Sequence, residues 1–235
     1  MALDKTKTNK SLGRQIHEHL LDLGIETPMC SPIYKTDDSK IELISSDMQL
    51  EKIRHSFENI MTVLGMDLTD DSLQETPMRM AKMFMHETMW GLDPENFPKC
   101  TIVKNKMKCD EMVLEKNVTI SSICEHHLKD FHGFATIAYI PSEKILGLSK
   151  FSRIADYFSR RPQIQERLTA QIFHTLSYLL ETENVAVAIH ATHGCVHSRG
   201  VQDPASSTFT NKLGGSFKNE PMTRAEFMAL LPKSV

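Results

Sequence analysis

The chain opens with segments whose apolar residues recur at helical spacing. Over residues 11–23 and 46–64 they return every three or four positions, and each stretch ends at a glycine. This spacing places the apolar side chains on one face of a helix, and a glycine is a typical residue just past a helix end. A third helix is expected to begin at Thr76-Pro77, with the threonine as N-cap. Residues 26–38 carry two prolines and predict an extended linker.

From about residue 111 the hydrophobic period changes to two. On Val113–Ile123, Val118 and Ile120 share one face while Thr119 and Ser121 share the other, which predicts a strand. Strands are also expected at 134–140, 185–191 and 205–213, and helices at 149–160, 162–180 and 223–231. Strands, two consecutive helices and further strands predict an α+β domain with the helices packed on one face of an antiparallel sheet.

The spacing of the apolar residues, together with the expected linker, divides the chain into three parts. Residues 1–44 are interpreted as an N-terminal arm and linker, 45–110 as a helical segment and 111–235 as the α+β domain. A chain of 235 residues is long enough for one large domain with an appended helical segment.

Composition narrows the class of protein. Apolar residues make up 40% and charged residues 24%, which is ordinary for a globular domain. A net charge of −3 argues against a nucleic-acid-binding protein, which usually has a basic excess. The chain begins without the apolar core of a signal peptide, and no apolar run reaches membrane-spanning length. Five cysteines without regular spacing indicate metal binding or catalysis in a reducing cytoplasm rather than cross-links.

Two short clusters carry the candidate chemistry, Cys124-Glu125-His126-His127 and His193-Gly194-Cys195. Thiolate and neutral imidazole are ligands that zinc prefers, and the C-x-x-H spacing allows one tight turn to direct two of them at one ion. Three protein ligands, Cys124, His127 and Cys195, leave a position for water, as in catalytic sites. His126 and His193 would then remain as proton carriers. One alternative is that the cysteines are buried small hydrophobes and the histidines ordinary surface or core residues. A second is that one spare histidine is a fourth ligand and closes a structural site.

A polyanion site is also expected, although the usual phosphate-binding loops are absent. Ser149-Lys150 begins a predicted helix, whose free backbone amides attract anions. Lys150 and Arg153 share a face of that helix, and Arg199 follows Cys195 closely. The alternative for each cation is ordinary surface charge.

Glu166 and Gln165 suggest recognition of a base. A carboxylate accepts two hydrogen bonds from a guanine-like N–H pair, and an amide lies beside it. The residues alone favour the alternative, a solvent-facing helix position for Glu166. Arg79 and Lys82 also share a helix face, where the alternative is a solvated surface.

Six runs of residues, in this order along the chain, resemble one known family. They are Glu75–Met83, Cys124–His127, Gly147–Ile154, Arg161–Leu168, His193–Cys195 and Arg199–Asp203. Together they look like GTP cyclohydrolase I, and the resemblance extends from about Ser46 to about Leu230. It departs at Ser198, where a lysine is common, at Pro204, and in the connection over residues 128–133.

The resemblance implies a zinc enzyme that converts GTP and water to 7,8-dihydroneopterin triphosphate and formate, the first step of tetrahydrofolate biosynthesis. It implies the tunnelling fold, an antiparallel sheet with two helices packed on one face, plus an N-terminal helical extension. Residues 111–235 would be the catalytic domain. The implied assembly is a homodecamer of two face-to-face pentamers with sites at subunit interfaces.

The resemblance also implies a role for each matched residue. Zinc would be held by Cys124, His127 and Cys195, and would activate the water that attacks C8 of guanine. His193 would act at the imidazole nitrogen, His126 at the ribose, and Ser149 in the later rearrangement. Gln165 and Glu166 would hold the guanine edge. The triphosphate would be held by Lys150, Arg153 and Arg199, with Arg79 and Lys82 from a neighbouring subunit.

Two rival functions remain open from the sequence. A zinc nucleoside deaminase would need H-x-E with a later P-C-x-x-C, which the chain lacks. A zinc-stabilised oligomer that binds nucleotides for regulation would have no need of two spare histidines.

Overall fold

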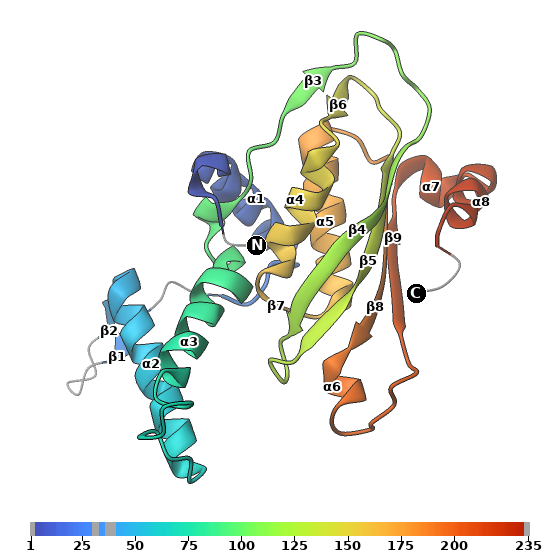
Figure 1. Ribbon diagram of the computed structural model, residues 1–235. Coiled ribbons are helices and arrows are strands. Elements are labelled where there is room, and N and C mark those ends of the chain that lie inside the picture. The colour runs from blue at the N-terminus through green and yellow to red at the C-terminus, as the bar shows by residue number, and fades with distance from the viewer. Residues whose placement is uncertain (1–2, 30–32, 36–40, 233–235) are drawn as a thin grey trace. The chain divides into compact units, whose positions relative to one another are not determined.

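The computed structural model describes residues 3–29, 33–35 and 41–232 (Figure 1). Internal contacts divide these residues into two units. The helical unit contains residues 28–90, and the sheet unit contains residues 4–27 and 91–232. The expected division at residues 44 and 110 stays a prediction.

The helical unit is built on α2 (Ser46–Val63) and α3 (Thr76–Lys82). A π-helical segment, η2 (Met83–Thr88), extends α3. Ser45 caps α2 by accepting a hydrogen bond from the amide of Met48. The rings of Phe57 and Phe84 stack 5.4 Å apart between these segments. The unit also contains a two-stranded antiparallel sheet, β1 (Ile33–Lys35) and β2 (Ile41–Leu43).

Two sequence-based expectations for this unit need correction. The N-cap of α3 is Glu75 and not Thr76, because Thr76 is the first residue of the helix, and Glu75 makes no side-chain capping hydrogen bond. Residues 33–35 form a strand rather than part of an extended linker. The rest of that expected linker falls partly outside the described residues.

The sheet unit is organised by a five-stranded sheet in the order β7-β4-β5-β8-β9. Its long strands are β4 (Val113–Cys124), β5 (Asp130–Tyr139) and β8 (Val185–His193), and β9 (Thr208–Leu213) forms one edge. All neighbours are antiparallel except β4 and the short β7 (Pro162–Gln163), which are parallel. The predicted strands are therefore present, although β5 begins at Asp130 rather than residue 134.

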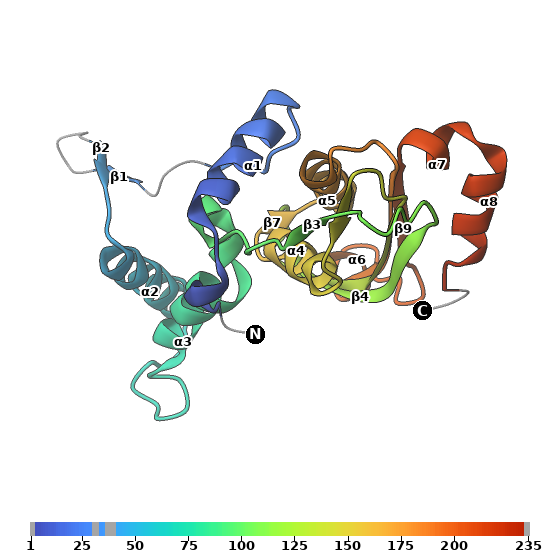
Figure 2. The same ribbon diagram turned by 90° about the horizontal axis from the view of Figure 1, so that it is seen from above.

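Two helices cover one face of this sheet, as expected. They are α4 (Ser149–Ser159) and α5 (Gln165–Leu180), and Figure 2 shows both on the same side of the sheet. Ile120, Ala135, Ile154 and Leu168 are fully buried in the layer between helices and sheet. The α+β class and the arrangement of the tunnelling fold are confirmed. The second helix begins at Gln165 rather than Pro162, because Pro162–Gln163 pairs with the end of β4.

Shorter elements complete the sheet unit. On the opposite face of the sheet, α7 (Gly215–Asn219) and α8 (Pro221–Ala229) pack Phe217 and Phe227 against alanines of β5 and β8 (Figure 2). The other elements are η1 (Lys5–Lys7), α1 (Lys10–Asp22), η3 (Trp90–Leu92), η4 (Pro94–Asn96), β3 (Ile102–Lys104), β6 (Lys144–Leu146) and α6 (Gly194–His197). None of the helices in the described part of the chain has the length and apolar character needed to cross a membrane.

A buried ion pair ties the segment after α1 to the corner between α4 and β7. The Arg161 side chain is fully buried, and its Nη1 donates to Oε1 of Glu26 at 2.7 Å. The same carboxylate oxygen accepts from Nε2 of Gln171 at 3.0 Å. The guanidinium also lies 4.6 Å from the ring centroid of Tyr157. Residues 25–27 are therefore fixed against the helices that cover the sheet.

Candidate metal centre

Cys124 and His127 come from the end of β4 and the turn that follows it. The amide of Leu128 donates to the carbonyl of Cys124 at 2.9 Å, and the amide of Cys124 donates to the carbonyl of Lys129 at 2.7 Å. Leu128 closes this turn in the left-handed conformation, with φ of 50°. The amide of Glu125 is bound to the carbonyl of Gln163 on β7. The turn that carries both side chains is therefore held from two sides.

Cys195 comes from α6, directly after β8. The register between β5 and β8 pairs Phe131 with His193, so the chain leaves β8 beside the start of β5. Gly194 permits this close passage, because a Cβ there would lie only 2.8 Å from the carbonyl oxygen of Asp130. Two segments about seventy residues apart in sequence thus meet at one end of the sheet.

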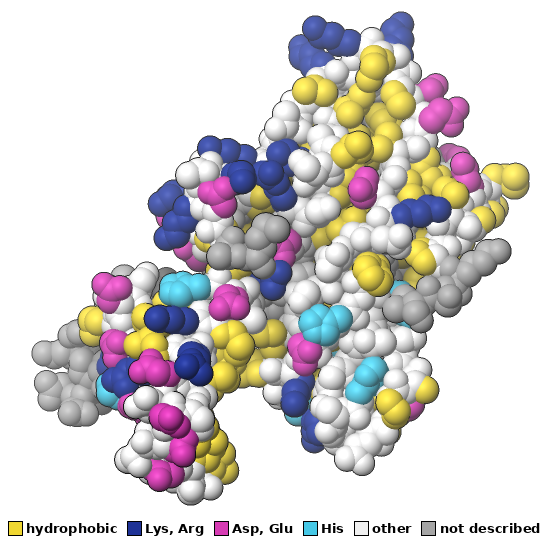
Figure 3. Space-filling view, in the orientation of Figure 1, with side chains coloured by type: hydrophobic (Ala, Val, Ile, Leu, Met, Phe, Trp, Pro, Cys, Tyr) yellow, Lys and Arg dark blue, Asp and Glu magenta, His cyan; other side chains and the backbone are white. Residues whose placement is uncertain are grey.

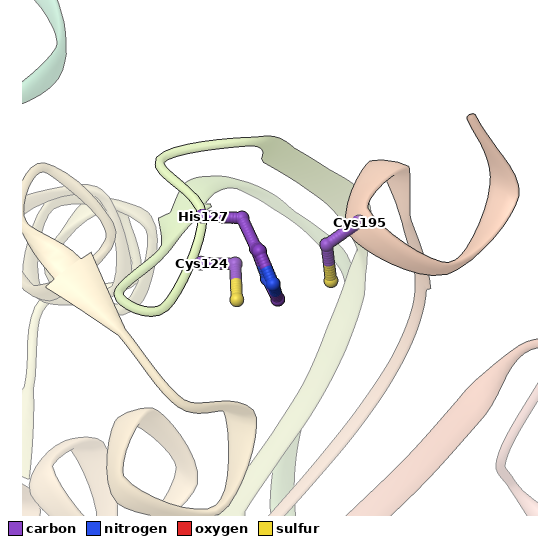
Figure 4. Close-up of side chains that lie close together, drawn as sticks. All are labelled: Cys124, His127 and Cys195. Carbon is purple, nitrogen blue, oxygen red and sulfur yellow. The ribbon is translucent and has the colours of Figure 1, made fainter. Parts of the chain in front are cut away.

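The ligand atoms of Cys124, His127 and Cys195 all lie within 4.8 Å of one another. Figure 4 shows the His127 ring between the two sulfur atoms, with all three side chains directed to the same space. Two thiols and one imidazole at this separation fit a tetrahedral zinc ion. Among the described residues no further histidine, cysteine or carboxylate belongs to this cluster. The set therefore has the three-ligand composition of a catalytic metal site.

The protonation of this cluster follows from its surroundings. Burial raises the pKa of the Cys195 thiol, and the neighbouring Cys124 thiol raises it further. Nη1 of Arg199 lies 2.8 Å from Nε2 of His127. Because a guanidinium only donates, Arg199 occupies the lone pair of Nε2 and would compete with a metal ion for that nitrogen.

The two spare histidines are close in sequence to the ligands of this cluster. His126 is exposed, and its Nδ1 lies 3.9 Å from Sγ of Cys124. His193 is half-buried and stacks on the ring of Phe131 at 4.6 Å between centroids. Burial lowers the pKa of His193, while the charge of Glu166 opposes this shift. The metal cluster therefore has one exposed and one firmly held imidazole as neighbours.

Comparison with known proteins identifies the family. Residues 53–232 match the family model of GTP cyclohydrolase I. The chain belongs to the GTP cyclohydrolase I family. A GTP cyclohydrolase 1 of Shewanella sp. (strain W3-18-1) is 50% identical over 214 residues, covering 91% of this chain and 95% of the relative. A GTP cyclohydrolase 1 of Photobacterium profundum is 52% identical over 208 residues, covering 88% of this chain and 91% of the relative.

One solved structure, the archaeosine synthase QueF-Like in the apo form, resembles the chain weakly. The TM-score is 0.35 at 15% sequence identity, and the match covers 44% of this chain and 93% of that chain. Family membership rests on the sequence relatives alone.

The cyclohydrolase motif at the start of α5 lies near the metal cluster. Glu166 is exposed, whereas Gln165 is buried with 2% exposure. Oε1 of Gln165 lies 2.8 Å from Nε2 of His193, so this motif meets the metal cluster through the histidine. The side chain of Gln165, expected at the guanine edge, is thus engaged within the chain.

The motif at the start of α4 lies at the other end of the sheet. Ser149 is the first residue of α4, and β6, just before it, is anchored by a hydrogen bond from the Leu146 amide to Oη of Tyr139. Tyr139 ends β5, and the first residue of that strand, Asp130, lies against Gly194, the residue before Cys195. A ten-residue strand spans roughly 30 Å. Figure 1 shows the start of α4 remote from α6. Within one chain, Ser149, Lys150 and Arg153 are therefore far from Cys124.

The remaining cationic residues predicted to bind the triphosphate lie in different parts of the structure. Arg199 contacts His127 and so lies directly at the metal cluster. Arg79 and Lys82 are exposed on α3, in the helical unit. Their expected role at the triphosphate concerns a neighbouring subunit and stays a prediction.

Sequence reasoning missed one ion pair of this site. Arg167 on α5 binds the carboxylate of Glu125, which stands inside the Cys-Glu-His-His motif, at 2.5 and 3.3 Å. The sequence feature that could have revealed this pair is the position of Arg167 outside the apolar stripe of its helix. A half-buried arginine at such a position needs a carboxylate as its partner.

Proposed function

We propose that the chain catalyses the GTP cyclohydrolase I reaction, in which water opens the imidazole ring of GTP, formate is released and the product rearranges to 7,8-dihydroneopterin triphosphate. The observation that carries the proposal is the convergence of Cys124, His127 and Cys195 within 4.8 Å in a member of this family. The relatives at about half identity bear the name of that activity.

Cys124, His127 and Cys195 would hold Zn²⁺, whose thiolate and imidazole preferences they match. A zinc ion in such a site supplies Lewis acidity that makes water nucleophilic near neutral pH. The turn after β4, which is held by hydrogen bonds from two sides, favours this assignment.

The two spare histidines would carry protons. His193 suits proton transfer at the imidazole ring of guanine, because its ring is stacked on Phe131 and bound to Gln165 and so keeps one orientation. His126 is exposed beside Cys124 and would serve the ribose protons of the later steps. Ser149 would assist the rearrangement.

Glu166 would recognise guanine. Its carboxylate is exposed at the start of α5, close enough to His193 to influence that imidazole electrostatically. A carboxylate there accepts the two N–H groups of the guanine edge. Gln165 was expected to share this contact, but its side chain is hydrogen-bonded to His193 instead.

The triphosphate site would require a second copy of the chain. Arg199 lies at the metal cluster, whereas Lys150 and Arg153 start α4 at the far end of the same sheet. One nucleotide can meet all three cations only if two chains contribute, with Arg79 and Lys82 as further contacts. Apolar side chains gather at the surface over the end of the sheet unit that carries β3 and β6, where Val103 and Met107 are exposed (Figure 3). These features favour a homo-oligomer, the decamer of the family.

We place the enzyme in the cytoplasm, where free thiols persist. The described cysteines are all unpaired, and the net charge of −3 favours a nucleotide substrate over a nucleic acid.

Incubation of the zinc-loaded protein with GTP tests the proposal. Formate and a pterin that becomes fluorescent on oxidation are expected in equal amounts, and chelation should abolish both until zinc is restored. Xanthine-like or inosine-like products would indicate a deaminase. Binding of GTP without turnover would indicate a regulatory nucleotide-binding protein, and either result would contradict the proposal.

A further inference from the structure

Gln165 is a buried glutamine whose side chain is fully used in hydrogen bonds. Its Nε2 lies 3.1 Å from the carbonyl oxygen of Ile189 and 3.0 Å from that of Thr208. Its Oε1 lies 2.8 Å from Nε2 of His193. The amide therefore links β8 and the edge strand β9 to the histidine beside the metal cluster.

The chemistry of these partners fixes the direction of each bond. Carbonyl oxygens only accept, so the atom facing Ile189 and Thr208 must be the NH₂ group of Gln165. The other end is then the carbonyl oxygen, which also only accepts. His193 must donate to it, so the proton of the neutral imidazole is on Nε2.

Two threonines reinforce the same orientation. Oγ1 of Thr169 donates its single proton to the backbone carbonyl of Gln165 at 2.8 Å. In its 2.7 Å contact with Thr210, Thr169 must therefore accept, and Thr210 donates. A lone pair of Thr210 Oγ1 is left facing Nε2 of Gln165 at 3.1 Å. The two N–H protons of Gln165 are thus shared among three acceptors, the carbonyls of Ile189 and Thr208 and the hydroxyl of Thr210.

The plane of the His193 ring is fixed as well. It stacks on Phe131, fully buried, with 4.6 Å between centroids and 15° between planes. No hydrogen bond in the described part of the chain involves Nδ1 of His193, whereas Nε2 is bound to Gln165. The imidazole therefore presents one nitrogen to a ligand.

We propose that Gln165 is a positioning residue that holds His193 with its proton on Nε2 and presents Nδ1 to the substrate. This inference rests on the proposed function for its catalytic consequence. Gln165 then acts through His193 rather than by touching guanine, and Thr210 supports it from β9.

Gln165→Leu, made in the full-length zinc-loaded protein, tests the proposal. Leucine keeps the volume but loses all four contacts, so kcat should fall about 100-fold, at the low end of a general acid–base contribution, with KM for GTP changed by about twofold or less. Zinc content should stay at the wild-type level. Thr210→Val should lower kcat by about fivefold, and Thr210→Ser, which keeps the hydroxyl, should restore it.

A raised KM with wild-type kcat in Gln165→Leu would assign the side chain to guanine binding and overturn the proposal. Equal kcat in Thr210→Val and Thr210→Ser would remove Thr210 from it. Crystal structures supply a readout that needs no turnover, because the His193 ring should leave its stack on Phe131 in Gln165→Leu. An unchanged ring would refute the positioning role even if the wild-type protein proved inactive on GTP.

Discussion

Arg167 binds the carboxylate of Glu125 through two hydrogen bonds, from Nη1 to Oε2 at 2.5 Å and from Nη2 to Oε1 at 3.3 Å. Glu125 lies in sequence between the candidate ligand Cys124 and the spare histidine His126. Arg167 of α5 therefore anchors the middle of the turn after β4 that carries Cys124 and His127. The Arg167 hydrogen bond keeps the pKa of Glu125 below its usual range. This pair belongs to the support of the metal site rather than to its ligands.

Arg167→Met should weaken zinc binding by about tenfold, because the turn loses its anchor and leaves a half-buried carboxylate unpaired. Arg167→Lys keeps the positive charge but cannot make both hydrogen bonds to the carboxylate. Its zinc affinity should therefore lie between those of the wild type and the methionine variant. Competition with a chelator of known affinity measures this. Wild-type affinity in Arg167→Met would show that the pair does not support the site.

Glu26→Ala should lower the free energy of unfolding by about 3–5 kcal/mol, because the fully buried guanidinium of Arg161 would lose its counter-ion. Denaturant unfolding measures the change. Glu18→Ala is the matched control, since Glu18 is exposed on α1 and its loss should leave stability nearly unchanged. Equal stabilities of the two variants would rule out an important role for the buried pair.

Zinc affinity should rise with pH. Burial and the neighbouring thiol raise the pKa of Cys195 above its ordinary value, so the thiol is protonated at neutral pH and must release its proton when a cation binds. Lower pH therefore favours the metal-free form. Chelator competition at about pH 6.5 and about pH 8 should give the tighter binding at the higher pH. A pH-independent affinity would mean that no proton is displaced.

Arg199→Ala should raise KM for GTP by about tenfold or more and leave KM for guanosine nearly unchanged, because only GTP carries the triphosphate. Steady-state kinetics with both substrates measures the difference. Arg14→Ala, which removes an exposed arginine paired with Glu95, is the control and should alter neither value. Equal effects of Arg199→Ala on both substrates would exclude the phosphate contact.

Much of the fold was predictable because its signals are local. The alternation along β4 is the pattern of a half-buried strand, and Val118 and Ile120 are indeed buried while Thr119 is exposed. The meeting of Cys195 with Cys124 and His127 followed from ligand chemistry and not from spacing alone. The start of α5 was misplaced because Pro162 also suits a first helical turn, and only pairing with β4 decides between the two.

The features that the sequence did not reveal depend on long-range contacts. Arg167 meets Glu125 across 42 positions, and Arg161 meets Glu26 across 135. Hydrophobic period contains no information about such pairs. The buried state of Gln165 was equally hidden, because it depends on carbonyl groups of β8 and β9 that no local pattern identifies.

The most direct test of the account measures zinc and formate together in Cys195→Ser. The wild type should bind one zinc ion per chain and release formate from GTP, and the variant should lose both, because the third ligand is gone. Cys109→Ser, which changes a free cysteine outside the cluster, should keep both. Stoichiometric zinc with formate release in Cys195→Ser would contradict the proposed metal centre.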